Sequence, residues 1–131
     1  MRRAAYVLPR IQSRLDLFED EQEVLPGIRA LPAPGHTPGH TAFLLTSANE
    51  SLLVPGDAWT HPVITMEKPE WPFLLDLDKE ASLHSKRNLL TLAAEQQYLV
   101  SAYHFPWPGL GHVVRRGEHW GWEPSEYHWG A

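Results

Sequence analysis

The stretch from Gly27 to Asp57 constrains the fold most, because it reads as a β-hairpin with polar, chemically active residues at one end. Two short apolar runs, residues 41–46 and 51–54, are separated by Ser-Ala-Asn-Glu, which has the composition of a turn. In an antiparallel hairpin the residue before the first strand and the residues after the second lie at the same end of the sheet. His40 and Asp57 are therefore expected to be neighbours, and imidazole beside carboxylate suits a divalent metal ion.

The loop before this hairpin, residues 34–40, has the sequence Pro-Gly-His-Thr-Pro-Gly-His. Each Pro-Gly pair combines a fixed φ with a residue that tolerates positive φ, so the chain can turn twice and present a histidine after each turn. A single Gly-His pair is best explained by a polar surface loop whose histidine faces water. The doubled motif, together with the later Gly56-Asp57 sequence, favours a site instead.

Composition limits the class of protein. With 131 residues, 43% of them hydrophobic and 21% charged, the chain is typical of one globular domain, or part of one, with a core. The absence of cysteine removes disulfides, thiolate zinc sites and cysteine nucleophiles, and it suits a reducing compartment, so we expect a cytoplasmic protein. The net charge of −5 and scattered basic residues argue against nucleic acid, and no apolar run is long enough to span a membrane.

The N-terminal segment carries little pattern, and residues 1–14 are expected to form an arm. Partial alternation of apolar residues over 11–18 is consistent with an edge strand, and residues 28–31 predict a strand that leads into the histidine loop.

A long loop is expected over residues 59–77, where three prolines exclude a long helix or a central strand. Loops of this size are usually binding lids or disordered connectors, and the aromatic content here favours a lid. We expect its substrate-binding residues to be Trp59, His61, Trp71 and Phe73.

Asp76 or Asp78 can cap a helix that runs to about residue 97, and residues 98–102 predict a strand directly after it. This strand and residues 51–54 should be parallel, because a helix connects them. Asp57 and His104 both follow the carboxyl ends of these strands, where ligand sites collect in open sheets. A single histidine among aromatic residues is more often a packed side chain, but convergence with His40 and Asp57 favours a ligand role for His104.

The C-terminal part predicts a hairpin, with strands over residues 112–116 and 119–122. Aromatic residues are dense here, and packing or an interface explains them better than substrate binding. They are Trp120, Trp122, Tyr127 and Trp129.

Three motifs, GIRALPAPGHTPGH, LLVPGDA and SAYHFPWPGLGHV, resemble in order and spacing the C-terminal half of metallo-β-lactamase-fold hydrolases. The branches of methyl parathion hydrolases and acyl-homoserine lactonases are the most similar. The resemblance implies an α+β fold: half of a four-layer αββα sandwich, with a mixed sheet and one main helix. Residues 1–131 would form a single half-domain, with a possible arm at 1–14 and a tail at 123–131.

The resemblance also implies roles for individual residues. His40 would be a ligand of a first metal ion, Asp57 the catalytic carboxylate that bridges two ions, and His104 a ligand of the second ion, whereas His36 would be a loop residue. The His-x-His-x-Asp-His signature of the family's N-terminal half is absent from this sequence. With those ligands missing, we expect one zinc ion, held by His40, Asp57 and His104.

Two functions remain open at this point. The first is a zinc-dependent hydrolase of a small ester, lactone or phosphotriester, working as part of a longer chain or with a site shared across a dimer. The second is a binding or interaction module that is not an enzyme and keeps a vestigial metal site. In both cases a homodimer is expected, because the single helix can cover only one face of the predicted sheet.

Overall fold

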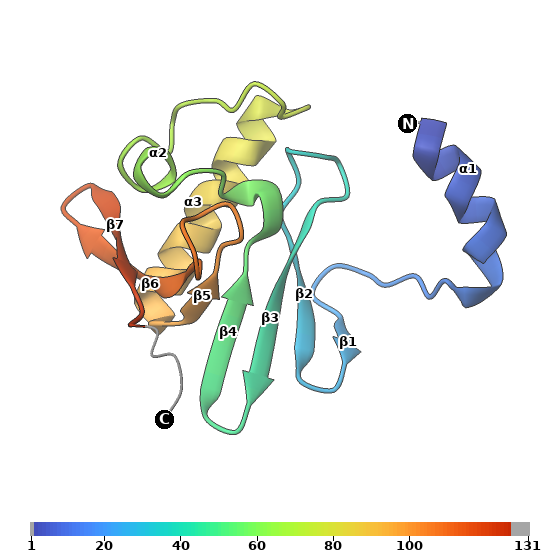
Figure 1. Cartoon of the computed structure of the whole chain (residues 1–131), viewed down its shortest axis with the longest axis horizontal. Coiled ribbons are helices and arrows are strands. Elements are labelled where there is room, and N and C mark those ends of the chain that lie inside the picture. The colour runs from blue at the N-terminus through green and yellow to red at the C-terminus, as the bar shows by residue number, and fades with distance from the viewer. Residues whose placement is uncertain (1, 127–131) are drawn as a thin grey trace.

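The computed structural model describes residues 2–126, and within these the side chains of residues 5–126. Figure 1 shows one curved sheet with a long helix behind it and an N-terminal helix that stands away from the rest. The strands are β1 (Glu23–Leu25), β2 (Ile28–Pro32), β3 (Thr41–Ser47), β4 (Glu50–Val54), β5 (Leu99–Ser101), β6 (Leu110–Arg116) and β7 (His119–Pro124). The α-helices are α1 (Arg2–Ile11), α2 (Pro62–Glu67) and α3 (Lys79–Gln96).

The seven strands lie side by side in chain order from β1 to β7. Neighbouring strands are antiparallel except β4 and β5, which are parallel and connected through α3. This confirms the α+β class, the mixed sheet and the parallel pair expected from the sequence. It also confirms the hairpin of β3 and β4, in which Phe43 pairs with Val54 and Leu45 with Leu52.

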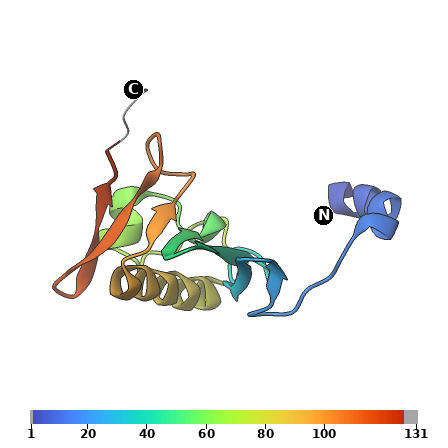
Figure 2. The same cartoon turned by 90° about the horizontal axis from the view of Figure 1, so that it is seen from below.

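Helix α3 covers one face of the central strands, as Figure 2 shows. It begins at Asp78, whose carboxylate accepts hydrogen bonds from the backbone N–H groups of Glu80 and Ala81. It ends at Gln97, which has a left-handed backbone conformation. Buried apolar side chains from the helix and the sheet form the core between them, including Leu31, Leu44, Leu53, Leu89, Leu90, Ala93 and Val100.

The opposite face of β2 to β5 has no helix over it within the described chain (Figure 2). Ladder pairing places Ile28, Phe43, Leu45, Leu52, Val54 and Leu99 on this face. These six side chains are only partly buried, and we call them the open sheet face. Three of them, Leu45, Leu52 and Leu99, line a hollow of about 670 Å³, which lies at the end of the strands away from Asp57.

The strand expected over residues 11–18 is not formed. Residues 2–11 form helix α1, a 3₁₀ turn follows at residues 12–14, and no strand forms over residues 11–18. Leu15 and Leu17 of the expected strand are exposed, and three partly alternating apolar residues are too weak a signal to define a strand. The edge strand is β1 instead, after a turn at residues 20–21, and Phe18 before this turn packs edge-on against Phe43, with ring centroids 6.2 Å apart.

The long loop after β4 contains one short helix, α2, which the sequence did not predict. Pro62 occupies the start of α2, where a missing N–H has no cost, and His61 caps the helix by accepting hydrogen bonds from the N–H groups of Val63 and Ile64.

The C-terminal hairpin is present as β6 and β7. Trp120 is buried, and Trp122 packs edge-on against Phe105, so packing explains both; Tyr127 and Trp129 lie outside the described residues.

None of the helices in residues 2–126 combines the length and apolar character needed to cross a membrane.

Candidate functional site

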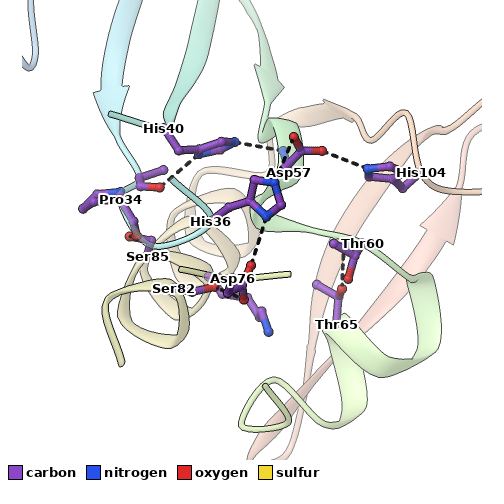
Figure 3. A network of polar contacts seen from close by, with 12 residues as sticks. Pro34, His36, His40, Asp57, Thr60, Thr65, Asp76, Ser82, Ser85 and His104 are labelled. Carbon is purple, nitrogen blue, oxygen red and sulfur yellow. Dashed lines mark hydrogen bonds and ion pairs between the residues drawn. The ribbon is translucent and has the colours of Figure 1, made fainter. Parts of the chain in front are cut away.

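Three segments meet at one end of the sheet, as Figure 3 shows. Asp57 lies in a 3₁₀ turn, Gly56–Ala58, directly after β4, and His104 follows β5, the parallel neighbour of β4. His40 is the last residue before β3, which pairs with β4. The hairpin and the crossover therefore bring His40, Asp57 and His104 together, as the sequence predicted.

His40 is held by hydrogen bonds on both ring nitrogens. Its Nδ1 lies 2.9 Å from the carbonyl oxygen of Ala33, and a carbonyl can only accept, so Nδ1 carries the proton. Its Nε2 accepts a hydrogen bond of 2.9 Å from the backbone N–H of Asp57. The ring is thus neutral in this arrangement, with one tautomer fixed by its two partners.

The Asp57 carboxylate has a partner on each oxygen. Oδ1 accepts hydrogen bonds from the hydroxyl of Tyr103 and, at 2.9 Å, from Nε2 of His104. Oδ2 lies 3.7 Å from Nε2 of His36. Asp57 is therefore surrounded by two imidazoles and a phenol, with a third of its side-chain surface still exposed.

These contacts shift two pKa values. The Tyr103 hydrogen bond is the largest cause of a lowered pKa at Asp57; partial burial opposes it, and His104 and His36 lower the pKa further. The same hydrogen bond is the main reason why the pKa of Tyr103 is raised. Asp57 is accordingly an anion at neutral pH, available to a cation, and Tyr103 keeps its proton.

A second carboxylate, Asp76, belongs to the same network but was expected only as a possible helix cap. Asp78 caps α3, whereas Asp76 is buried and accepts hydrogen bonds from His36 Nδ1 at 3.1 Å and from Ser82 Oγ at 2.6 Å. His36 therefore lies between Asp76 and Asp57 (Figure 3). The sequence did contain a signal for His36, because this residue belongs to the first Gly-His pair of the doubled motif. The resemblance, however, implied only a loop residue at this position.

The four residues expected to bind substrate lie in different places. Trp59 is 0% exposed and stacks on Phe105 in the core, so in this structure it offers no surface to a substrate. His61 uses its Nδ1 to cap α2. Trp71 is exposed on the loop before α3, and Phe73 stacks against His36 with ring centroids 6.2 Å apart. Phe73 is thus the one of the four that touches the histidine cluster.

The donor atoms suit zinc in kind, since imidazole nitrogen and carboxylate oxygen are common zinc ligands. The Nδ1 contact of His40 to a carbonyl is also typical of metal-binding histidines, because it leaves Nε2 free of a proton. In the arrangement described here, however, His40 and His104 both direct Nε2 to Asp57. Within residues 2–126 no group of three or more His, Asp or Glu side chains is placed to hold an ion, so the ligand set is incomplete as it stands.

Comparison with known proteins supports the fold. An N-acyl homoserine lactonase of Bacillus sp is 31% identical over 96 residues, which are 72% of this chain and 36% of that protein. Among solved structures, AidC, a dizinc quorum-quenching lactonase in complex with a product, matches with a TM-score of 0.87 and 29% identity over 94% of this chain and 42% of its own. AbOPH, a hydrolase of the beta lactamase superfamily, matches with a TM-score of 0.79 and 23% identity, over 92% of this chain and 42% of its own. At this identity the match supports a shared fold and no more.

No protein-family model matches the chain. The chain spans about a third of the length of the curated relatives it matches. Its seven-stranded mixed sheet, the lactonase relatives and the structural match to AidC agree on one assignment. The chain carries part of the metallo-β-lactamase fold, and it is similar to hydrolases that have this fold.

Proposed function

We propose that this chain is a half-domain of a metal-dependent hydrolase whose substrates are lactones or related small esters, with an incomplete zinc site. The observation that carries this proposal is the position of Asp57, a partly exposed anionic residue at the carboxyl end of β4, whose backbone N–H bonds to His40 and whose carboxylate bonds to His104 after the parallel strand β5. The lactone class comes from the relatives, which are N-acyl homoserine lactonases.

In this proposal His40, Asp57 and His104 would hold one zinc ion once Nε2 of each histidine leaves its hydrogen bond to Asp57. Zinc would supply a Lewis acid that polarises an ester carbonyl and lowers the pKa of a bound water. Two hydrogen bonds favour metal binding by these residues. The carbonyl of Ala33 fixes the tautomer of His40, and the hydroxyl of Tyr103 keeps Asp57 ionised and oriented. Affinity is expected to be weaker than in a complete site, since further ligands and their supporting hydrogen bonds are missing.

Turnover by the chain alone is expected to be absent or very weak. The sequence has no His-x-His-x-Asp-His run, and it spans 36% of a lactonase relative. Asp57 is the candidate catalytic residue, and in this proposal it contributes to catalysis only by holding the metal ion. The chain therefore contributes part of a site, which another chain or a further segment would complete.

Calorimetric titration of zinc into metal-free protein tests the proposal. Binding of about one ion is expected for the wild type and for His119→Ala, an exposed histidine remote from the cluster, with strong weakening in His104→Ala and Asp57→Asn. Absence of binding, or equal binding in all four proteins, contradicts the zinc site. Robust zinc-dependent hydrolysis of an N-acyl homoserine lactone, abolished by Asp57→Ala, would show instead that the chain is a complete enzyme.

A second candidate function is a dimeric binding module without hydrolase activity. The open sheet face favours it, since large apolar patches in soluble proteins usually contact a partner. The simplest partner is a second copy of this chain, packed through the same face about a two-fold axis. Solution mass and zinc content distinguish the candidates, because the module requires a dimer but no metal.

A further inference from the structure

Lys86 is a buried cation in the middle of α3, and the proposed function gives it no task. The residue is 5% exposed, and its ammonium donates hydrogen bonds to the carbonyl of Pro69 at 3.2 Å and to that of Trp71 at 3.4 Å. Both carbonyls belong to the irregular chain between α2 and α3. Because burial of a lysine is costly unless its charge is paired or hydrogen-bonded, these contacts need an explanation.

The chain that Lys86 contacts, residues 69–76, is here called the strap. Pro69 at its first end and Asp76 at its second end are buried, and Phe73 between them is partly buried. The other residues of the strap are exposed: Glu70, Trp71, Pro72, Leu74 and Leu75. Burial of apolar surface therefore contributes little to holding the strap in place, and its position depends on polar contacts at the two ends.

The two ends of the strap are attached to α3 by different groups. At the second end, Ser82 Oγ donates to the carboxylate of Asp76 at 2.6 Å. At the first end, the ammonium of Lys86, one helical turn after Ser82, holds the carbonyls of Pro69 and Trp71. Asp76 also attracts this ammonium, so the buried cation and the buried carboxylate compensate each other's charge.

Between its anchored ends the strap carries two contacts to the histidine loop. Phe73 stacks on the ring of His36 with centroids 6.2 Å apart and 24° between the planes, and Asp76 Oδ1 lies 3.1 Å from His36 Nδ1. His36 lies between Asp76 and Asp57, as Figure 3 shows. A displaced strap would therefore move one wall of the candidate site.

We propose that Lys86 is a positioning residue, whose ammonium fixes the first end of the strap on α3 and thereby holds Phe73 on the ring of His36. The alternative is that the alkyl stem of Lys86 only fills space, while Ser82 and Asp76 hold the strap. The two roles use different parts of one side chain, so a substitution can separate them. The proposal concerns the metal-free chain, and only an effect on zinc binding would rest on the proposed function.

Lys86→Met keeps an unbranched apolar stem and removes the ammonium. If the ammonium anchors the strap, the amides of Trp71 and Asp76 should exchange with solvent about tenfold faster or more than in the wild type. The imidazole signals of His36 should also shift, because the ring of Phe73 no longer stays on them. Unchanged exchange in the strap and unchanged His36 signals overturn the proposal in favour of space filling by the stem.

Leu90→Ala is the matched control for loss of stability. Leu90 lies one turn after Lys86 on the same helix, is 0% exposed and packs in the core. Its truncation is expected to destabilise the whole fold, yet it should leave the imidazole signals of His36 at their wild-type positions. If Leu90→Ala shifts these signals as Lys86→Met does, they report only lower stability, and the positioning role is wrong.

A measurement on the wild type covers the case in which Lys86→Met does not fold. In ¹H–¹⁵N spectra of the lysine side chains, the Nζ hydrogens of Lys86 should exchange with water more slowly than those of Lys79, which is exposed at the start of α3. Equal exchange rates contradict the anchor. Zinc enters none of these measurements, so a wild type that binds no zinc refutes the proposed function, while the exchange data still decide the role of Lys86.

Discussion

Nε2 of His40 accepts a hydrogen bond from the backbone N–H of Asp57 at 2.9 Å, across 17 residues of sequence. This bond closes the end of the hairpin of β3 and β4 and joins the histidine loop to the turn that carries Asp57. His40 is consequently a structural residue of the metal-free chain as well as the proposed zinc ligand.

Replacement of His40 by alanine is expected to destabilise the metal-free protein. The carbonyl of Ala33 and the N–H of Asp57 both lose a partner in a part-buried setting, which is expected to reduce the free energy of unfolding by about 2 kcal/mol. Urea unfolding in the presence of a chelator measures this, with His119→Ala as the control at an exposed position. Equal stability of the two variants would show that His40 acts through metal alone.

Gly56→Ala tests how closely the turn approaches His40. An added Cβ would lie 2.8 Å from Nε2 of His40, and Gly56 has a φ of +58°, which is unfavourable for alanine. Gly117 has a similar φ of +62° but no atom within 4 Å of its would-be Cβ, so Gly117→Ala provides a matched control for the backbone effect alone.

The control substitution is expected to cost about 1–2 kcal/mol, the usual penalty of a left-handed conformation for a residue with a Cβ. Gly56→Ala should cost more, and it should shift the imidazole resonances of His40, which Gly117→Ala should leave unchanged. Equal losses of stability with unchanged His40 resonances would mean that the turn adjusts freely and does not constrain the histidine.

Much of this arrangement could be predicted from the sequence, because it depends on local patterns and topology. The apolar runs at residues 41–46 and 51–54 and the polar turn between them predict the hairpin, observed as Thr41–Ser47 and Glu50–Val54. The helix that follows makes β4 and β5 parallel, and this alone places Asp57 beside His104.

The contacts of His36 could not be predicted in the same way. They depend on the path of the irregular chain before α3, which has no periodicity to indicate where Asp76 and Phe73 lie. The strand predicted over residues 11–18 was wrong for a related reason: three partly alternating apolar residues are a weak signal, and Leu15 and Leu17 are exposed in the structure. The zinc ligands and the dimer stay predictions.

Lys86 is expected to make the free energy of unfolding depend on pH in the alkaline range. The residue is 5% exposed, its ammonium donates to the carbonyls of Pro69 and Trp71, and burial lowers its pKa against the attraction of Asp76 and Glu70. The unfolded chain therefore holds this proton to higher pH than the folded chain, and the contribution of Lys86 to stability rises with pH between the lowered pKa and about 10.5.

The expected result is that the wild type gains stability relative to Lys86→Met as the pH rises through this range, by at most about 1.4 kcal/mol per pH unit. Urea unfolding of both proteins at several alkaline pH values measures the difference, in which the other titrating groups largely cancel. Lys79→Met, at an exposed position at the start of α3, should show no such trend relative to the wild type. A constant difference between wild type and Lys86→Met would show that Lys86 titrates as in water.

The open sheet face leads to the last prediction, which concerns self-association. Leu52 lies at its centre, paired with Leu45 on one side and Leu99 on the other, and a dimer formed through this face should bury on the order of 2,000 Å² in total. Leu52→Glu would place a carboxylate in that interface and is expected to give a monomer in sedimentation equilibrium at micromolar concentration. Leu74→Glu, the same change at a loop position that is 85% exposed, should leave the wild-type mass unchanged.

The wild type offers an independent check on the dimer, because its midpoint of thermal unfolding should rise with protein concentration when folding and association are coupled. That dependence should disappear in Leu52→Glu and persist in Leu74→Glu. A wild type that sediments as a monomer of about 14.9 kDa, with a midpoint independent of concentration, would rule out the second copy as the partner of this face. The open sheet face would then bind a different polypeptide, and that polypeptide would complete the proposed zinc site in place of a second copy of this chain.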